Sequence, residues 1–219
     1  MPLTGPEIVL YEKPEPGIIV ITLNRPERLN ANTLESFDRL NEAWRRFRDD
    51  DEARVAIITG AGDRAFCVGM DLKDQAERVA KDPSFDIVKL KPGVLDGSEG
   101  TPRGAGVFKP IIAAINGIAT AGGFQLVMMA DLRIAAENAR FGIGEVKVGR
   151  GTPWAVPLLW QMPLPIAAEV LYLGEMLPAA RLYEVGWLNK VVPQGQLITE
   201  ALNMARILRD NAPLSVRAI

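Results

Sequence analysis

The sequence predicts an α/β fold with a buried sheet, and two observations support this class. Short runs of β-branched and other apolar residues alternate along the chain with segments in which apolar residues recur every three to four positions. Of the 219 residues, 48% are apolar and 24% are charged, which is enough to bury a substantial core and unlike the composition of disordered chains. We therefore expect one main domain.

The N-terminal part predicts a hairpin followed by an amphipathic helix. Two β-branched runs, residues 8–11 and 18–23, flank the turn-rich segment 13–17. Asn32 is the predicted cap of the helix, because Glu35 follows three residues later. Apolar residues then recur on one helix face at Leu34, Phe37, Leu40, Trp44 and Phe47.

The next part predicts a strand and two loops. Residues 55–59 are typical of a short buried strand, and residues 60–70 indicate a loop that ends where Asp71 caps a second helix. Three prolines and five glycines between residues 82 and 106 indicate a mobile loop. The later predicted elements are strands at 111–115, 132–135 and 189–192, an apolar helix at 122–129, proline-punctuated helices after 151, and an amphipathic helix at 197–208.

Composition excludes several kinds of protein. With 25 basic and 27 acidic side chains the formal charge is −2, which argues against nucleic acid as the main partner. The chain has no histidine, which excludes Ser-His-Asp and Cys-His catalysis and histidine-ligated zinc or haem. Any chemistry must therefore use carboxylates, amides, hydroxyls or backbone N–H groups.

Cysteine content and the distribution of apolar residues indicate a location. Cys67 is the one cysteine, so no internal disulfide can form, as suits a reducing cytoplasm. The N-terminus has no basic start followed by an apolar stretch, and no run approaches the ~20 apolar residues of a membrane helix. We expect a soluble, cytoplasmic protein without membrane contact.

One motif imitates a dinucleotide-binding fingerprint. Residues 60–65, Gly-Ala-Gly-Asp-Arg-Ala, follow a predicted strand, and Asp82 lies about twenty residues further on. In the real motif a helix must begin at the glycines, whereas the residues after 65 show no helical period. A turn that ends a strand is the better interpretation.

Two other glycine loops suggest chemistry. Residues 68–71, Val-Gly-Met-Asp, and 121–123, Ala-Gly-Gly, each follow a buried strand and precede a helix. Backbone N–H groups at such helix starts have no partner within the helix, so a pair of them can bind a developing oxyanion. Each loop alone is more often an ordinary turn, so the pair matters only together with its surroundings.

Those surroundings resemble the crotonase superfamily, the enoyl-CoA hydratase/isomerase group, in the right order over nearly the whole chain. The resemblance implies a crotonase-like ββα-repeat spiral core. The matching segments are residues 21–31, 58–60, 65–72, 109–117, 121–123, 130–135, Phe141-Gly142 with Glu145, Ala179-Ala180 with Gly186 and Asn189, and 191–193.

The resemblance implies an acyl-CoA thioester as substrate, with no other cofactor and no metal. In that family the residues at the positions of Met70 and Gly122 supply the two oxyanion N–H groups. Segments 28–31 and 65–72 would line coenzyme A, with Arg28 either a phosphate partner or a solvated surface residue. The implied substrate-binding residues are Arg28, Leu29, Ala31, Ala65, Val68, Asp71 and Leu72.

The sequence departs from the hydratase pattern at one of two catalytic positions. Hydratases of the family use two glutamates, and here the first position holds Gln125 and the second Glu145. An amide can orient water but cannot accept its proton, whereas a single partly desolvated glutamate can still move a proton between carbons. Hydratase is the family default, and the departure favours an isomerase or another one-carboxylate reaction such as a lyase or dehydratase. A catalytically weak acyl-CoA-binding protein is the rival.

Four further residues have expected structural roles. Asp131 is expected to cap backbone and Cys67 to be a small buried residue. Trp154 and Trp160 border the acyl pocket or, with better support, pack in the core.

The C-terminal end shapes two further expectations. We expect a core over residues 1–195 and the start of a C-terminal helical region over 196–219, where the family usually continues into further helices. Those helices build the trimer, so the resemblance implies a homotrimer or dimer of trimers if they are present and a truncated region if they are not.

Overall fold

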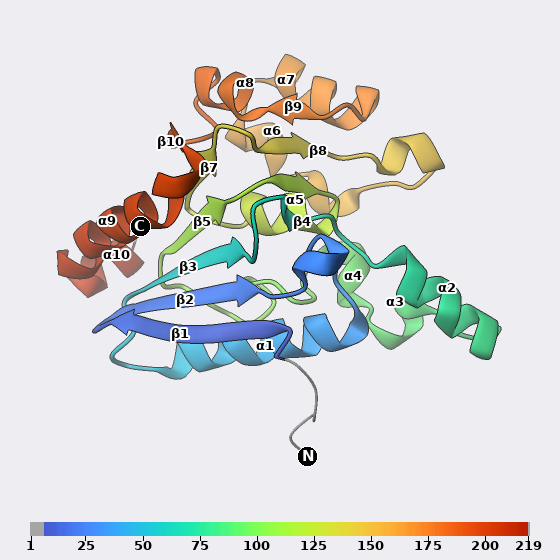
Figure 1. Ribbon diagram of the computed structural model, residues 1–219, viewed down its shortest axis with the longest axis horizontal. Helices are drawn as coiled ribbons and strands as arrows, with labels where there is room; N and C mark the ends of the chain where they lie inside the picture. The colour runs from blue at the N-terminus through green and yellow to red at the C-terminus, as the bar shows by residue number, and fades with distance from the viewer. Residues whose placement is uncertain (1–6, 219) are drawn as a thin grey trace.

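The computed structural model describes residues 7–218. Its larger sheet has six strands: β1 (Val9–Glu15), β2 (Ile18–Leu23), β3 (Val55–Gly60), β5 (Ile111–Ile115), β7 (Leu132–Ala136) and β10 (Lys190–Val192). They lie in the order β1-β2-β3-β5-β7-β10 (Figure 1). Only β1 is antiparallel to its neighbour, and every later pair is parallel. The predicted α/β class is confirmed, as are the strands expected near these positions.

A second, smaller sheet was not predicted. Its strands are β4 (Ala65–Cys67), β6 (Ile118–Thr120), β8 (Arg140–Gly142) and β9 (Leu177–Pro178). They lie in the order β4-β6-β8-β9, and β4, β6 and β8 are parallel. The expectation of an unbroken loop over 60–70 is therefore wrong. Two or three residues are too few to show the alternation that marks a strand.

The N-terminal hairpin is confirmed, but its turn is shorter than expected. The segment 13–17 was predicted as a turn, whereas β1 continues to Glu15 with a register shift between Glu12 and Glu15. Pro14 fits within a strand here because β1 is the edge of the sheet, where a missing N–H donor breaks no ladder bond.

The first long helix, α1 (Leu34–Asp49), has a different cap from the predicted one. Thr33 Oγ1 accepts from the Ser36 N–H, and Ser36 Oγ accepts from the Thr33 N–H, which is a reciprocal capping box. Asn32 instead forms a parallel bridge with Met70. The predicted apolar face is confirmed except at Leu34, because Phe37, Leu40, Trp44 and Phe47 are all buried.

The segment expected to be a mobile loop contains two short helices. The helix α2 (Leu72–Lys81) has no buried residue and projects from the body of the molecule (Figure 1). It is followed by α3 (Ile87–Leu90) and α4 (Gly93–Asp96). Beyond α4 the chain packs on α1, where Trp44 Nε1 donates to the Gly100 carbonyl oxygen at 3.1 Å. Contacts distant in sequence, which periodicity does not report, create this order.

The remaining helices were expected in outline. The apolar helix is α5 (Gly122–Met128), and the helices after residue 151 are α6 (Leu158–Gln161), α7 (Leu164–Ala168) and α8 (Ala179–Glu184). The chain ends in α9 (Leu197–Asp210) and α10 (Pro213–Arg217). Short turns of other helix types are η1 (Pro26–Arg28), η2 (Glu145–Val148), η3 (Pro153–Ala155), η4 (Glu169–Leu173) and η5 (Gln194–Gln196).

Helices cover both faces of the larger sheet. Alternate strand residues point to opposite faces, so Ile19 and Ile58 pack with α1 whereas Ile18 and Ile57 pack with α9. Leu197, Ala201 and Ala205 of α9 belong to the same hydrophobic cluster as residues of the sheet, so both sides of the predicted boundary between 195 and 196 contribute to one core. The division of the chain into a core over 1–195 and a C-terminal helical region over 196–219 stays a prediction. Within residues 7–218 no helix has the length and apolar character needed to cross a bilayer.

Two buried asparagines hold the turn between β3 and β4. Asn116 Nδ2 donates to the carbonyl oxygens of Gly62 (2.8 Å) and Ala65 (3.0 Å), and its Oδ1 accepts from the Gly60 N–H. Asn30 Nδ2 donates to Ala65 as well. Side-chain amides thus replace the ladder bonds that a tight turn lacks, and they fix where β4 begins.

We expect N116A to lower the free energy of unfolding by about 2–4 kcal/mol, because it leaves several buried backbone groups without partners. Urea unfolding followed by circular dichroism measures this. The control is N203A on the exposed side of α9, where a change within about 0.5 kcal/mol is expected. Equal effects of the two substitutions would contradict the assignment.

Candidate active site

A cavity of about 730 Å³ lies beside the carboxyl ends of β4, β6 and β8. Because these three strands are parallel neighbours, the residues that follow them meet at one edge of the small sheet. Met70 follows β4, Gly122 follows β6 and Glu145 follows β8, and all three line the cavity. Most of the remaining wall is apolar, with Phe37 of α1 and Trp154 of η3 among its members.

In the first loop, the Met70 N–H is left out of the hydrogen bonds that join the loop to Asn32. The Asn32 N–H donates to the Gly69 carbonyl oxygen (2.7 Å), and the Asp71 N–H donates to the Asn32 carbonyl oxygen (2.8 Å). This parallel bridge uses the peptide groups on either side of Met70, so the N–H of Met70 itself points away from Asn32. In the described part of the chain, no backbone carbonyl accepts from it.

The second loop presents the Gly122 N–H. Gly122 is the first residue of α5, so its N–H has no acceptor within the helix. Ala121, which precedes it, has φ 52° and ψ −125°, a conformation that is costly for a residue with a Cβ. Such strain persists only where the surrounding structure imposes it, and here it lies immediately before the Gly122 N–H.

The two loops are in close contact. A Cβ on Gly69, whose φ is +81°, would lie 2.6 Å from the Ala121 Cβ and 3.1 Å from the Gly122 N. A Cβ on Gly123 would lie 2.0 Å from the Cys67 carbonyl oxygen. Glycine at both positions is therefore a packing requirement, and it brings the two candidate oxyanion donors to one wall of the cavity.

The acid–base candidate is partly withdrawn from water. Glu145 is half-buried, and its Oε2 has no hydrogen-bond partner within residues 7–218. Burial raises the pKa of its carboxyl, and the positive charge of Arg150 opposes that rise. A carboxylate with an unused oxygen and a raised pKa is suited to accept and return a proton.

Gln125 lies on α5 three residues after Gly122 and also lines the cavity. The residue is 8% exposed, and its Nε2 is a second buried atom for which the described chain supplies no partner. Gly97 packs against it so closely that a Cβ there would lie 2.1 Å from Nε2. The structure thus keeps an uncommitted amide at the position where a second carboxylate would be needed for two-carboxylate chemistry.

A model of the enoyl-CoA hydratase/isomerase family matches residues 13–219 of the sequence. The chain belongs to this family. It is 37% identical over 221 residues to enoyl-CoA hydratase EchA19 of Mycobacterium tuberculosis, covering 99% of this chain and 79% of that protein. It is 39% identical over 206 residues to a carnitinyl-CoA dehydratase of Salmonella paratyphi B, covering 92% and 75% respectively.

The fold comparison agrees with the family assignment. A solved enoyl-CoA hydratase structure from Bacillus anthracis matches with a TM-score of 0.86 at 29% identity, over 96% of this chain and 80% of that one. The resemblance to the crotonase superfamily is therefore confirmed. Its crotonase-like fold is confirmed as well, and the chain is an enzyme of this family.

The predicted coenzyme A-binding residues divide into two groups. Val68 and Leu72 line the cavity. Asp71 caps α2 and pairs with Arg25 at 3.0 Å, and these contacts lower the pKa of its carboxyl against the effect of burial. Arg28 is exposed, Leu29 has a left-handed φ of 52°, and Ala31 and Ala65 are buried away from the cavity wall. Contact of these residues with coenzyme A stays a prediction.

Sequence reasoning missed Glu99, which lines the cavity. Its Oε1 accepts from Asn41 Nδ2 at 2.8 Å and lies 3.2 Å from Lys91 Nζ. Unlike Glu145, this carboxylate is committed to an ion pair. It lies in the proline- and glycine-rich segment, where no periodicity or motif marks a functional position.

The other sequence expectations have mixed outcomes. Asp131 does cap backbone, because its Oδ2 accepts from the Ile111 N–H at 2.8 Å. Cys67 is buried, and burial raises the pKa of its thiol to about 12. Trp154 is both buried and part of the cavity wall, whereas Trp160 is 79% exposed, so its expected core or pocket role is wrong. The motif at 60–65 joins two strands, as expected of a turn.

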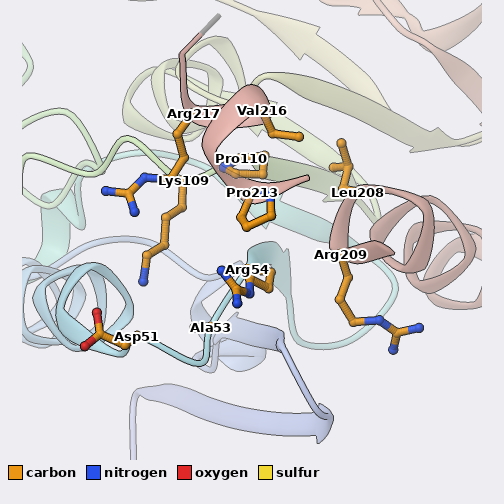
Figure 2. A pocket seen from close by; sticks show the side chains of 10 residues that line it. All are labelled: Asp51, Ala53, Arg54, Lys109, Pro110, Leu208, Arg209, Pro213, Val216 and Arg217. Atoms are coloured by element: carbon orange, nitrogen blue, oxygen red, sulfur yellow. The ribbon is translucent and has the colours of Figure 1, made fainter. Parts of the chain in front are cut away.

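Figure 2 shows a second cavity, of about 30 Å³, where α9 and α10 approach the start of β3. Lys109 lies in its wall and donates through Nζ to the carbonyl oxygens of Phe47 (2.8 Å) and Asp50 (2.6 Å) at the end of α1. Arg54, Arg209 and Arg217 also line this cavity. The space is about that of one water molecule, too small for a thioester. Among residues 7–218 no three His, Cys, Asp or Glu side chains are grouped so as to hold a metal ion.

We expect E145Q to raise the unfolding temperature at pH 8 and to leave it unchanged at pH 4. A raised folded-state pKa means that the folded protein holds this proton more tightly than the unfolded chain. Stability is therefore lost as pH rises from the ordinary glutamate value of 4.5 through the folded-state pKa, and glutamine avoids that loss.

The matched control is E175Q. Lys147 lowers the pKa of the exposed Glu175 carboxyl, so this substitution should give no stabilisation at pH 8. Thermal unfolding followed by circular dichroism at both pH values measures the difference. An E145Q protein less stable than the parent at pH 8 would contradict the buried, unpartnered state of this carboxylate.

Proposed function

We propose that this enzyme binds an acyl-CoA thioester in the large cavity and polarises its carbonyl through the Met70 and Gly122 N–H groups. Two loops in contact support this proposal, because each carries an N–H group that has no backbone acceptor among the residues that the structure describes. They would stabilise the negative charge that moves onto the thioester oxygen when a proton leaves the neighbouring carbon. No metal or redox cofactor is part of this proposal.

Glu145 is the proposed proton carrier, and the reaction is a shift of the double bond of an enoyl-CoA. The carboxylate takes a proton from C2 of a 3-enoyl thioester, and the electron pair moves into a dienolate whose charge rests on the carbonyl oxygen. Glu145 then returns the proton to C4, which forms the 2-enoyl thioester. One base that is also the acid suffices, because no water is added and the proton is conserved.

The observation that carries this choice is the pair of carboxylates in the cavity wall. Glu145 has an unpartnered oxygen within the described structure, whereas Glu99 is held by Lys91 and Asn41. At the remaining position Gln125 offers an amide, which cannot remove a proton from water. The site thus offers one working acid–base group.

Hydration is the second candidate. The names of the relatives, hydratase and dehydratase, favour it, and the uncommitted Gln125 amide could orient a water molecule for attack while Glu145 supplies the only carboxylate chemistry. The predominantly apolar wall favours an apolar acyl chain in either case. Assembly into trimers, a cytoplasmic location and coenzyme A contact by Arg28 remain predictions from the resemblance.

The deciding experiment incubates the protein with 2-enoyl-, 3-enoyl- and 3-hydroxyacyl-CoA and follows mass and ultraviolet absorbance. We expect 3-enoyl-CoA to gain conjugated absorbance at constant mass, and E145Q to lose at least about 10³-fold in kcat while still binding the thioester. A product heavier or lighter by one water would support hydration instead. Turnover that is absent from both proteins, with binding retained, would support a binding protein.

A second prediction concerns Gln125. We expect Q125E to raise the rate of 2-enoyl-CoA hydration about tenfold or more, because it restores a second carboxylate beside Glu145. Hydration is measured as loss of enoyl absorbance, and Q196E, which changes an exposed glutamine outside the cavity wall, is the control. Efficient hydration by the unchanged protein would contradict the role given to this amide.

A further inference from the structure

Arg133 of β7 has an unusual set of acceptors. Its guanidinium donates to four backbone carbonyl oxygens and one amide oxygen, none of which belongs to a carboxylate. The acceptors are Val127 (3.0 Å), Met128 (3.1 Å), Ala130 (3.0 Å), Trp187 (3.3 Å) and Gln161 Oε1 (2.9 Å). Burial lowers the pKa of the guanidinium to about 10, so it remains charged at neutral pH.

Three of these carbonyls lie at or just beyond the carboxyl end of α5. Carbonyl groups there have no donor within the helix, and they carry its negative partial charge. Gln161 Nε2 also donates to the Met128 carbonyl oxygen at 3.0 Å. The Arg133 guanidinium and the Gln161 amide thus both donate to carbonyl oxygens at the carboxyl end of α5, and neither residue belongs to that helix.

An aromatic contact holds the same helix from the side. The Trp187 ring stacks on Phe124 of α5 with ring centres 5.0 Å apart, and the Arg133 guanidinium lies 4.8 Å from the centre of the Trp187 ring. Trp187 Nε1 donates to the Gln161 oxygen that also accepts from Arg133. Arg133, Gln161 and Trp187 are therefore one connected network, and every member contacts α5 or its neighbours.

The amino end of α5 carries one candidate catalytic group, the Gly122 N–H, and Gln125 lies in the middle of the helix. Gly122 and Gln125 both lie on this helix and line the cavity. A helix of seven residues is only about 10 Å long, so a rotation or slide at its carboxyl end reaches the Gly122 N–H almost undiminished. A donor displaced by about 1 Å from the developing oxyanion can cost about 100-fold in rate.

We propose that Arg133 is a positioning residue, which fixes α5 so that the Gly122 N–H meets the thioester oxygen. The inference rests on the proposed function and adds a group outside the cavity wall. Lysine cannot replace it, because an ammonium lacks the planar fork that reaches several carbonyls at once.

The test uses R133K with 2,4-hexadienoyl-CoA, a conjugated thioester whose absorbance moves to longer wavelength when its carbonyl is polarised. We expect the bound parent protein to show this shift and R133K to lose most of it. For the isomerisation of 3-enoyl-CoA, we also expect the kcat of R133K to be about 30- to 100-fold below that of the parent protein, while its KM stays within roughly threefold. The control is R206K on α9, whose arginine pairs with Glu15 and should affect neither quantity.

A merely structural role would give a different result. If R133K lowers the unfolding temperature but keeps the spectral shift and kcat, the positioning role is wrong. If R133K does not fold, the same measurements on Q161M test the proposal. This substitution removes one acceptor of Arg133 and one donor to the Met128 carbonyl oxygen, and it leaves the guanidinium in place. A smaller shift and lower kcat in Q161M support the proposal, and unchanged values overturn it.

The proposed function can fail separately. If the parent protein binds hexadienoyl-CoA without any spectral shift, no polarising donors act on the carbonyl. In that case the oxyanion role of Met70 and Gly122 is wrong, and the positioning role of Arg133 falls with it. If the spectral shift is present in the parent protein and persists in R133K, only the positioning role of Arg133 is refuted.

Discussion

The parallel pairing of β4, β6 and β8 is the constraint on which the rest of the site depends. Each of these strands has only three residues, yet their carboxyl ends share one edge. Met70, Gly122 and Glu145 lie far apart in sequence, and this pairing brings them to one cavity wall. The larger sheet supports the arrangement, because β3, β5 and β7 each lead directly into one of the short strands.

The same wall gathers features that oppose stability. Ala121 adopts a strained conformation, and Glu145 Oε2 and Gln125 Nε2 are buried without partners within residues 7–218. Elsewhere the described chain satisfies its buried asparagines thoroughly, as Asn30 and Asn116 show. Two of the four buried side-chain atoms without a partner in the described chain lie in this wall, the others being Tyr11 Oη and Gln194 Oε1. A strained residue and unsatisfied polar atoms beside one cavity are typical of a site shaped for a ligand.

Much of the fold was predictable because its signals are local. Four buried strands of the larger sheet, the apolar face of α1 and the glycine start of α5 all appear as short-range patterns. The errors also have physical causes. Asn32 and Glu35 imitate a cap that Thr33 and Ser36 make, and two- or three-residue strands show no alternation. The position of Glu99 in the cavity wall was not predictable from local sequence, because it depends on contacts with Asn41 and Lys91.

The sequence by itself determined the family, the two glycine loops, and an amide rather than a carboxylate at position 125, since each is a matter of residue identity and order. Within residues 7–218, tertiary structure alone decided which carboxylate oxygen has no partner and which N–H groups have no backbone acceptor. It also decided how Arg133 binds the carboxyl end of α5. These depend on distances between segments that the chain order does not encode locally. Burial, pairing and direction arise only when the sheets and helices have packed together.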